Sequence, residues 1–189
     1  MTRKLTLLLG GALLLAGCRE ATTMPTRKDT LAELNVDQVL YGTLHVITRK
    51  GVRKANLHAD TAYFKDVDSR VDLRGMRLEF FNEQTGAVSG TLSSRTGEYD
   101  MRTGAMIARG KAVLKVQGPE GERSVESEEL HYDVQADRIW SGKPTVMREG
   151  GRTVHGASFE SDTRFQNLTV QRAKVSGPAP SGGDGKVRF

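Results

Sequence analysis

Histidines and clustered glutamates are the residue types in this chain that could support catalysis or bind a metal. The chain has four histidines, namely His45, His58, His131 and His155. None forms a His-x-x-His pair, and each lies at a polar position of an alternating segment, so the spacing does not suit a zinc site. Glu126, Glu128 and Glu129 could supply paired carboxylates for glycoside hydrolysis, but such a charge run is ordinarily a hydrated surface.

Other reactive motifs do not occur. There is no Gly-x-Ser-x-Gly nucleophile elbow and no glycine-rich phosphate loop. We therefore expect no catalytic residue, no metal site and no cofactor.

The single cysteine, Cys18, is placed for a covalent modification. A basic N-terminus (residues 1–4) and an apolar run (residues 5–15) precede it, as in a secretory signal. The run is too short for a membrane-spanning helix, which needs about 20 residues. The segment Leu-Ala-Gly-Cys at 15–18 resembles the bacterial lipobox, in which the cysteine is acylated. The sequence thus predicts a signal peptide at 1–17 and a lipid anchor at Cys18, which would hold the chain by about 0.8 kcal/mol per buried CH₂.

Composition divides the rest of the chain into three parts. Residues 18–35 are polar and suit a lipidated tether, 36–177 carry the regular patterns of one domain, and 178–189 have the composition of a disordered tail. The formal net charge is +5, and two of these charges, Arg3 and Lys4, lie in the signal. Because the remaining charges alternate in sign, we expect no nucleic-acid partner.

Glycines mark a repeat along the predicted domain. They are Gly42, Gly75, Gly110, Gly142 and Gly177, at intervals of 33, 35, 32 and 35 residues. A period of this length indicates stacked supersecondary units. We expect the first four of these glycines to form a bend or bulge that begins a strand.

Apolar and polar residues alternate within each unit. Leu78 and Phe80 flank Glu79, for example, and Leu114 and Val116 flank Lys115. This period of two predicts β-strands with one apolar face, arranged as three or four short strands per unit. Pro144 falls inside such a strand and should interrupt it or place it at an edge.

Aromatic residues recur at the repeat spacing in three units. Phe64, Tyr99 and Tyr132 each follow a small residue by five positions. We expect them to pack between layers of the fold.

Taken in order, the repeats resemble a known family. The segments "LHADTAYF", "SSRTGEYDMRTG", "ARGKAVLKV" and "SGKPTVMREGGRTVHGASFESD" are similar to those of the LptC family, the periplasmic component of the lipopolysaccharide-export bridge, and to the OstA-like fold that it shares with LptA. The resemblance covers about residues 36–177. LptC proteins often carry a transmembrane anchor, whereas this chain has the lipobox-like segment instead.

The resemblance implies a twisted, open, all-β jellyroll of repeated antiparallel strands. It implies a V-shaped apolar groove that holds the acyl chains of lipopolysaccharide, and edge pairing with an inner-membrane lipopolysaccharide ABC transporter at one end and an LptA-like protein at the other. The chain would be periplasmic and anchored to a membrane through Cys18. The inner membrane is favoured, but the sequence leaves open which membrane holds the anchor, because Arg19 gives no retention signal. The expected groove residues are the apolar positions of the strands: Leu44, Val46, Leu57, Ala59, Leu78, Phe80, Val88, Leu92, Leu114, Val116, Val125, Ile139, Val146, Val154 and Phe159.

Two other functions stay open on sequence grounds. One is an adaptor lipoprotein that joins partners by strand pairing around a closed, dry core. The other is an envelope hydrolase that uses Glu126 or Glu128. A cavity between the apolar faces would favour the carrier over the adaptor.

Overall fold

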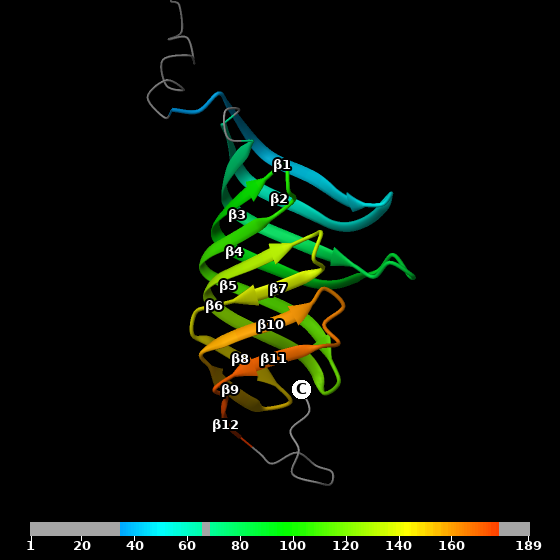
Figure 1. The fold of residues 1–189 in the computed structure, drawn as a ribbon, viewed down its shortest axis with the longest axis vertical. Coiled ribbons are helices and arrows are strands. Elements are labelled where there is room, and N and C mark those ends of the chain that lie inside the picture. Colours follow the sequence, from blue (N-terminus) through cyan, green and yellow to red (C-terminus); the bar gives the residue numbers. More distant parts are fainter. Residues whose placement is uncertain (1–34, 66–68, 178–189) are drawn as a thin grey trace, which may run out of the picture.

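The computed structural model describes residues 35–65 and 69–177 of the chain. These residues form twelve β-strands in one antiparallel sheet and no helix, which confirms the all-β prediction (Figure 1). Within these ranges no helical segment has the length and apolarity needed to cross a membrane.

Six long strands come first, followed by six short ones. The long strands are β1 (Gln38–Arg49), β2 (Val52–Lys65), β3 (Arg70–Phe81), β4 (Val88–Asp100), β5 (Met106–Gly118) and β6 (Gly121–Asp133). The short strands are β7 (Arg138–Ser141), β8 (Thr145–Glu149), β9 (Arg152–Gly156), β10 (Ser158–Asp162), β11 (Leu168–Gln171) and β12 (Lys174–Ser176).

The sheet divides at β6. Strands β1 to β6 pair in chain order, each antiparallel to the next. The C-terminal part of β6 (131–133) pairs with β7, and its N-terminal part (124–127) pairs with β8. One branch continues from β7 to β10 and β11, and the other continues from β8 to β9 and β12. The C-terminal region therefore forms two separate arms.

Glycines in the left-handed conformation bend β1, β3 and β5 inside the strand. Gly42, Gly75 and Gly110 have φ values of 59°, 60° and 74°, which glycine adopts without the penalty that a Cβ atom brings. At Gly75 a Cβ atom would also collide with the side chain of Asp60. The prediction that these glycines begin strands is wrong, because each strand turns a corner at its glycine and continues.

Each of the first three repeats is a hairpin of two long, bent strands, so the prediction of three or four short strands per unit is also wrong there. In the fourth repeat the corner breaks the strand completely. Residues 142–144 separate β7 from β8, and Pro144 has no backbone N–H for a ladder hydrogen bond. The predicted interruption at Pro144 is confirmed.

The bends fold the sheet into two facing layers. Layer A contains β7, β10, β11 and the halves of β1–β6 that continue this arm, and layer B contains β8, β9, β12 and the other halves. His45 of β1 contacts Tyr99 of β4 (Nε2 to the phenol oxygen, 3.2 Å), and Phe80 of β3 contacts Tyr132 of β6 (ring centroids 5.2 Å apart). Because strands in one layer lie about 4.8 Å apart, residues three strands apart would be about 14 Å apart within it. These contacts therefore join the two layers.

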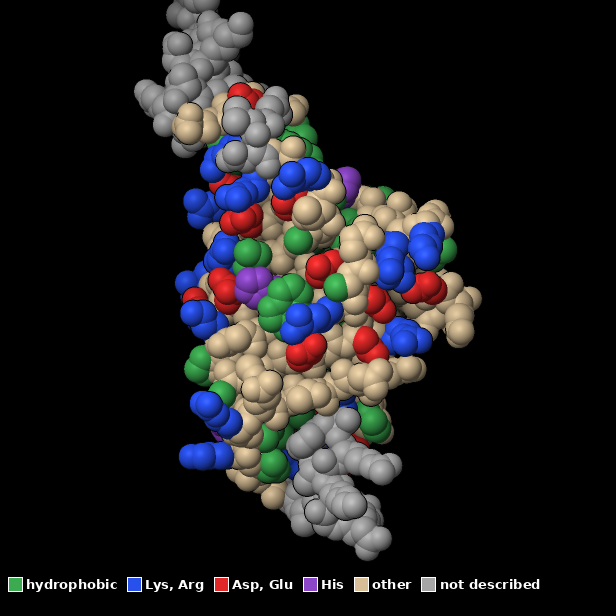
Figure 2. Space-filling view, in the orientation of Figure 1, with side chains coloured by type: hydrophobic (Ala, Val, Ile, Leu, Met, Phe, Trp, Pro, Cys, Tyr) green, Lys and Arg blue, Asp and Glu red, His purple; other side chains and the backbone are tan. Residues whose placement is uncertain are grey.

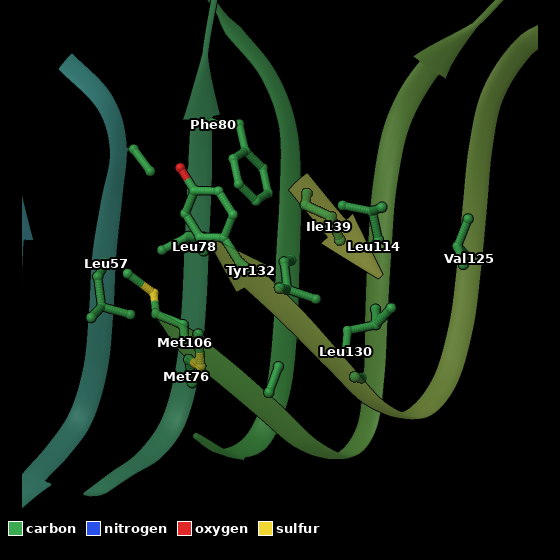
Figure 3. Packing of buried hydrophobic residues seen from close by; sticks show 14 of the residues in the cluster. Leu57, Met76, Leu78, Phe80, Met106, Leu114, Val125, Leu130, Tyr132 and Ile139 are labelled. Atoms are coloured by element: carbon green, nitrogen blue, oxygen red, sulfur yellow. The ribbon is translucent and has the colours of Figure 1, made fainter. Parts of the chain in front are cut away.

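The core lies between the layers. Leu78, Leu92, Leu130 and Ile139 are fully buried there, and Figure 3 shows Leu78 and Ile139 among the other apolar side chains of the bent strands. Buried and more exposed residues alternate along β3 and β6, as the period of two predicts. The expected packing of Tyr99 and Tyr132 between the layers is confirmed by their contacts with His45 and Phe80.

Candidate functional site

A cavity of about 550 Å³ opens between the two layers where the strands end. We call it the mouth cavity. Turns of both layers line it: the β1–β2 and β3–β4 turns from layer B, and the β6–β7 and β10–β11 turns from layer A. Its lining residues are Arg49, Lys50, Val52, Lys54, Phe80, Phe81, Asn82, Glu83, Gln84, Ser89, Tyr132, Asp137, Thr163, Arg164 and Gln166.

Aromatic side chains form the inner end of the mouth cavity. Phe80 and Tyr132 meet edge to face across the layers, with their rings at 88° (Figure 3). Phe165, from the β10–β11 turn, meets Phe80 at a centroid distance of 5.6 Å. Burial raises the pKa of Tyr132, and the charge of Asp137 raises it further, so this phenol stays neutral. The inner end is therefore apolar and uncharged.

Charged side chains surround the outer end of the mouth cavity. Lys54 forms an ion pair with Glu83, and the Thr163 hydroxyl donates a hydrogen bond to Asp137. Figure 2 shows basic and acidic side chains gathered on the side where the β3–β4 turn projects. The site thus combines an apolar inner end with a hydrated, charged rim.

Eleven of the fifteen expected groove residues lie on the facing sides of the layers, and each is at most 4% exposed. They are Leu57, Ala59, Leu78, Phe80, Leu92, Leu114, Val116, Val125, Ile139, Val154 and Phe159. Of these, only Phe80 lines the mouth cavity. The other ten pack against one another behind it and form one apolar core.

The structure places the other four elsewhere. Leu44 and Val46 are 58% and 49% exposed on β1, where they pair with His58 and Asn56 on the outer face. Val88 is 53% exposed at the β3–β4 turn. On β1 the residue that faces inward is Ile47 and not its neighbour Val46. Ile47 is buried and pairs with buried Ala55.

Val146 is the fourth of these residues. It is half-buried on β8 and pairs with Glu126 and His155. Its neighbour Met147 is the β8 residue that enters the core. Along β8, as along β1, the alternation is present but its inward phase is the opposite of the expected one.

The glutamates considered for hydrolysis lie on the outer face and not in the mouth cavity. Glu126 pairs with Arg148, and Glu129 accepts hydrogen bonds from Arg109 (2.9 Å) and His131 (2.7 Å). Burial raises the pKa of Glu129, but these two hydrogen bonds outweigh it and lower the pKa overall. A carboxylate whose pKa is lowered, as that of Glu129 is, is a poor general acid. Among residues 35–65 and 69–177, no group of three or more His, Cys, Asp or Glu side chains could hold a metal.

Sequence reasoning missed the rim of the mouth cavity. Arg49, Lys54 and Arg164 are far apart in the sequence, and no local pattern relates them. Phe165 carried a weak signal, because it is the one large apolar residue within the polar turn 162–167 and is 8% exposed.

The two ends of the sheet have open edges. In the part of the chain that the structure describes, β1 pairs only with β2, β11 only with β10, and β12 only with β9. The edge strand β1 also exposes apolar side chains at Tyr41, Leu44 and Val46. Unpaired strand edges of this kind can extend into another chain.

Several predictions from the sequence fall outside the described residues. These are the signal peptide at 1–17, the lipidation of Cys18, the tether up to residue 34 and the tail at 178–189. They stay predictions.

Comparison with known proteins gives the family and the fold. The family of lipopolysaccharide-assembly, LptC-related proteins matches residues 5–175. The crystal structure of LptH from Pseudomonas aeruginosa, described as the LptA-homologous periplasmic component of the lipopolysaccharide transport device, is similar with a TM-score of 0.51 and 15% identity. The match covers 66% of this chain and 95% of LptH. A search of curated protein sequences gives no significant match.

The match to LptH supports the β-jellyroll fold predicted from the sequence. The family match spans almost the whole chain and agrees with the resemblance seen in the repeats. Proteins of this family are bridge components and are not known as enzymes. This chain therefore belongs to the LptC family and is a periplasmic component of lipopolysaccharide transport.

Proposed function

We propose that this chain binds lipopolysaccharide at the mouth cavity, receives it from the inner-membrane ABC transporter and passes it to an LptA-like protein. The observation that carries this proposal is the mouth cavity itself. It opens between the layers, and its aromatic inner end, Phe80 and Tyr132, continues into the apolar core. A lipid held there keeps its polar head in water and its acyl chains between the layers.

Acyl chains need space between the layers, and the ten residues behind Phe80 fill that space with one another. Lipid uptake therefore requires the layers to separate. Replacing contacts between apolar side chains by contacts with acyl chains has a small hydrophobic cost, because the side chains then touch methylene groups and not water. The eleven inward-facing residues listed above would line the path of the chains.

The chain has a passive part in this transport. The work of extraction comes from the transporter's cytoplasmic ATPase, and each jellyroll holds the lipid until the next one accepts it. Proteins of this kind need an apolar path and matching edges and no reacting group, which agrees with the ion-paired state of Glu126 and Glu129.

Open strand edges supply the contacts with the two partners in this proposal. The β1 edge would pair with the transporter, since the predicted anchor at Cys18 precedes β1 by only 20 residues. An extended chain of that length reaches at most about 70 Å. The β11 and β12 edges at the other end would then pair with the LptA-like protein.

Site-specific photo-crosslinking in the full-length chain tests lipid binding. A crosslinker at Leu78, which faces the core, should capture lipopolysaccharide, because the acyl chains pass between the layers. The matched control is Arg77, the preceding residue, which is exposed on the outer face of the same strand. Capture at Leu78 alone supports the proposal, whereas no capture at Leu78, or equal capture at both positions, contradicts it.

The packed core also favours a second candidate, an adaptor that joins partners by strand pairing and carries no lipid. Crosslinkers at Val46 on β1 and Val175 on β12, both exposed, should capture different protein partners under either function. If these positions capture protein while Leu78 captures no lipid, the adaptor is the correct function.

A further inference from the structure

The rim of the mouth cavity carries more positive than negative charge. Arg49 and Lys50 lie at the β1–β2 turn of layer B, and Arg164 lies in the β10–β11 turn of layer A. Among residues 35–65 and 69–177, none of the three forms an ion pair. The acidic residues of the rim, Glu83 and Asp137, already have partners of their own.

The charges of Arg49 and Arg164 both lower the pKa of Glu83, although the two arginines come from opposite layers. The pKa of Glu83 is lowered first by its hydrogen bond from Lys54, and the charges of Arg164 and Arg49 lower it further. Both guanidinium groups are thus close enough for their fields to reach one carboxylate. A second anion placed at the rim would meet the same two charges.

The two arginines are also related to the aromatic residues at the inner end of the cavity. Phe165 follows Arg164 directly and contacts Phe80, and Arg49 is close enough to Tyr132 to act on its phenol. Both arginines line the same cavity as Phe80 and Tyr132. A molecule whose apolar part reached Phe80 would place its polar part at the rim that carries Arg49 and Arg164.

We propose that Arg49 and Arg164 form a binding site for the phosphate groups of an anionic lipid headgroup, with one arginine supplied by each layer. This inference rests on the proposed lipid binding and specifies the chemistry of the headgroup. A guanidinium group binds phosphate through two parallel N–H···O bonds. Because the arginines belong to different layers, one headgroup bound by both would also hold the layers in a fixed relation at the mouth.

Binding measurements with two matched lipids test this site. The full-length chain is titrated with fluorescent bisphosphorylated lipid A and with the same lipid after its phosphates are removed, in the same detergent. The double variant Arg49→Gln, Arg164→Gln should bind the phosphorylated lipid at least about tenfold more weakly and the dephosphorylated lipid as tightly as before. The control variant, Arg102→Gln with Arg172→Gln, removes two exposed arginines that do not line the mouth cavity and should leave both affinities unchanged.

Four results would overturn the inference. Equal weakening for both lipids, or equal weakening by the control variant, would show that the rim does not recognise phosphate. Inorganic phosphate that binds the unaltered chain as tightly as the phosphorylated lipid does would indicate a site for the free ion and not for a headgroup. If neither lipid binds the unaltered chain, the proposed function fails first and this inference fails with it.

Discussion

Replacing Phe80 with alanine tests whether the inner end of the mouth cavity is packed as the structure shows. Phe80 is 1% exposed and contacts the rings of both Tyr132 and Phe165. Loss of a buried phenylalanine side chain costs about 3–5 kcal/mol. Two aromatic contacts place Phe80 in the upper part of this range, so we expect the free energy of unfolding to fall by about 4–5 kcal/mol.

Urea titration followed by the fluorescence of Trp140, the only tryptophan, measures this change. Val88→Ala is the control, because Val88 was expected in the same groove but is largely exposed, and its cost should stay below about 0.5 kcal/mol. A double-mutant cycle of Phe80→Ala with Tyr132→Leu should give a coupling of about 0.5–1.5 kcal/mol. A cost below about 1 kcal/mol for Phe80→Ala would refute the reasoning, because it would mean that the layers do not pack at this point.

Three further predictions concern the frame around the site. Arg123→Met should lower the free energy of unfolding by about 3–5 kcal/mol, because it leaves Glu149, its buried partner at 2.7 Å, without a counter-charge. Adding Glu149→Met should restore much of this loss in the same urea titration. No restoration would contradict the pairing. Gly75→Ala should destabilise the chain more than Gly42→Ala, since both glycines have positive φ but only Gly75 lacks room for a Cβ atom; equal midpoints would contradict the close approach. The pKa of Glu129 is lowered from its usual value near 4.5, so the ionised carboxylate stabilises the fold above that pH, and this contribution is lost as the pH falls through the lowered pKa. The free energy of unfolding measured from pH 6 to pH 3 should therefore fall less in Glu129→Gln than in the unaltered chain. Parallel curves would contradict this.

The local sequence pattern was sufficient to predict the all-β class of the fold. The alternation around Leu78 and Leu114 identified strands with one buried face, because side chains on a strand point to opposite sides in turn. The glycine spacing identified the repeat, and Pro144 identified the place where a strand is interrupted. The order of the segments was enough to indicate the LptC family, which the family comparison then matched over residues 5–175.

Local pattern was insufficient for the phase of the edge strands. Leu44 and Val46 alternate with polar residues as clearly as Leu78 and Phe80 do, yet they lie outside. On β1 the inward positions belong to His45 and Ile47, since Tyr99 of the opposite layer accepts a polar neighbour there. Alternation defines two faces, and only the facing layer decides which of them is buried.

The sequence alone therefore determined the strands, their repeat and the family, because these depend on neighbours within a few residues or on the order of segments. Tertiary structure decided how long the strands are and where they bend, since the positive φ of Gly75 and the lack of room for a Cβ atom beside Asp60 arise only in the folded chain. It also decided the functional geometry, because the two layers bring the turns with Arg49 and Arg164 to one cavity. The distance between such residues in the folded chain depends on the path of every strand between them.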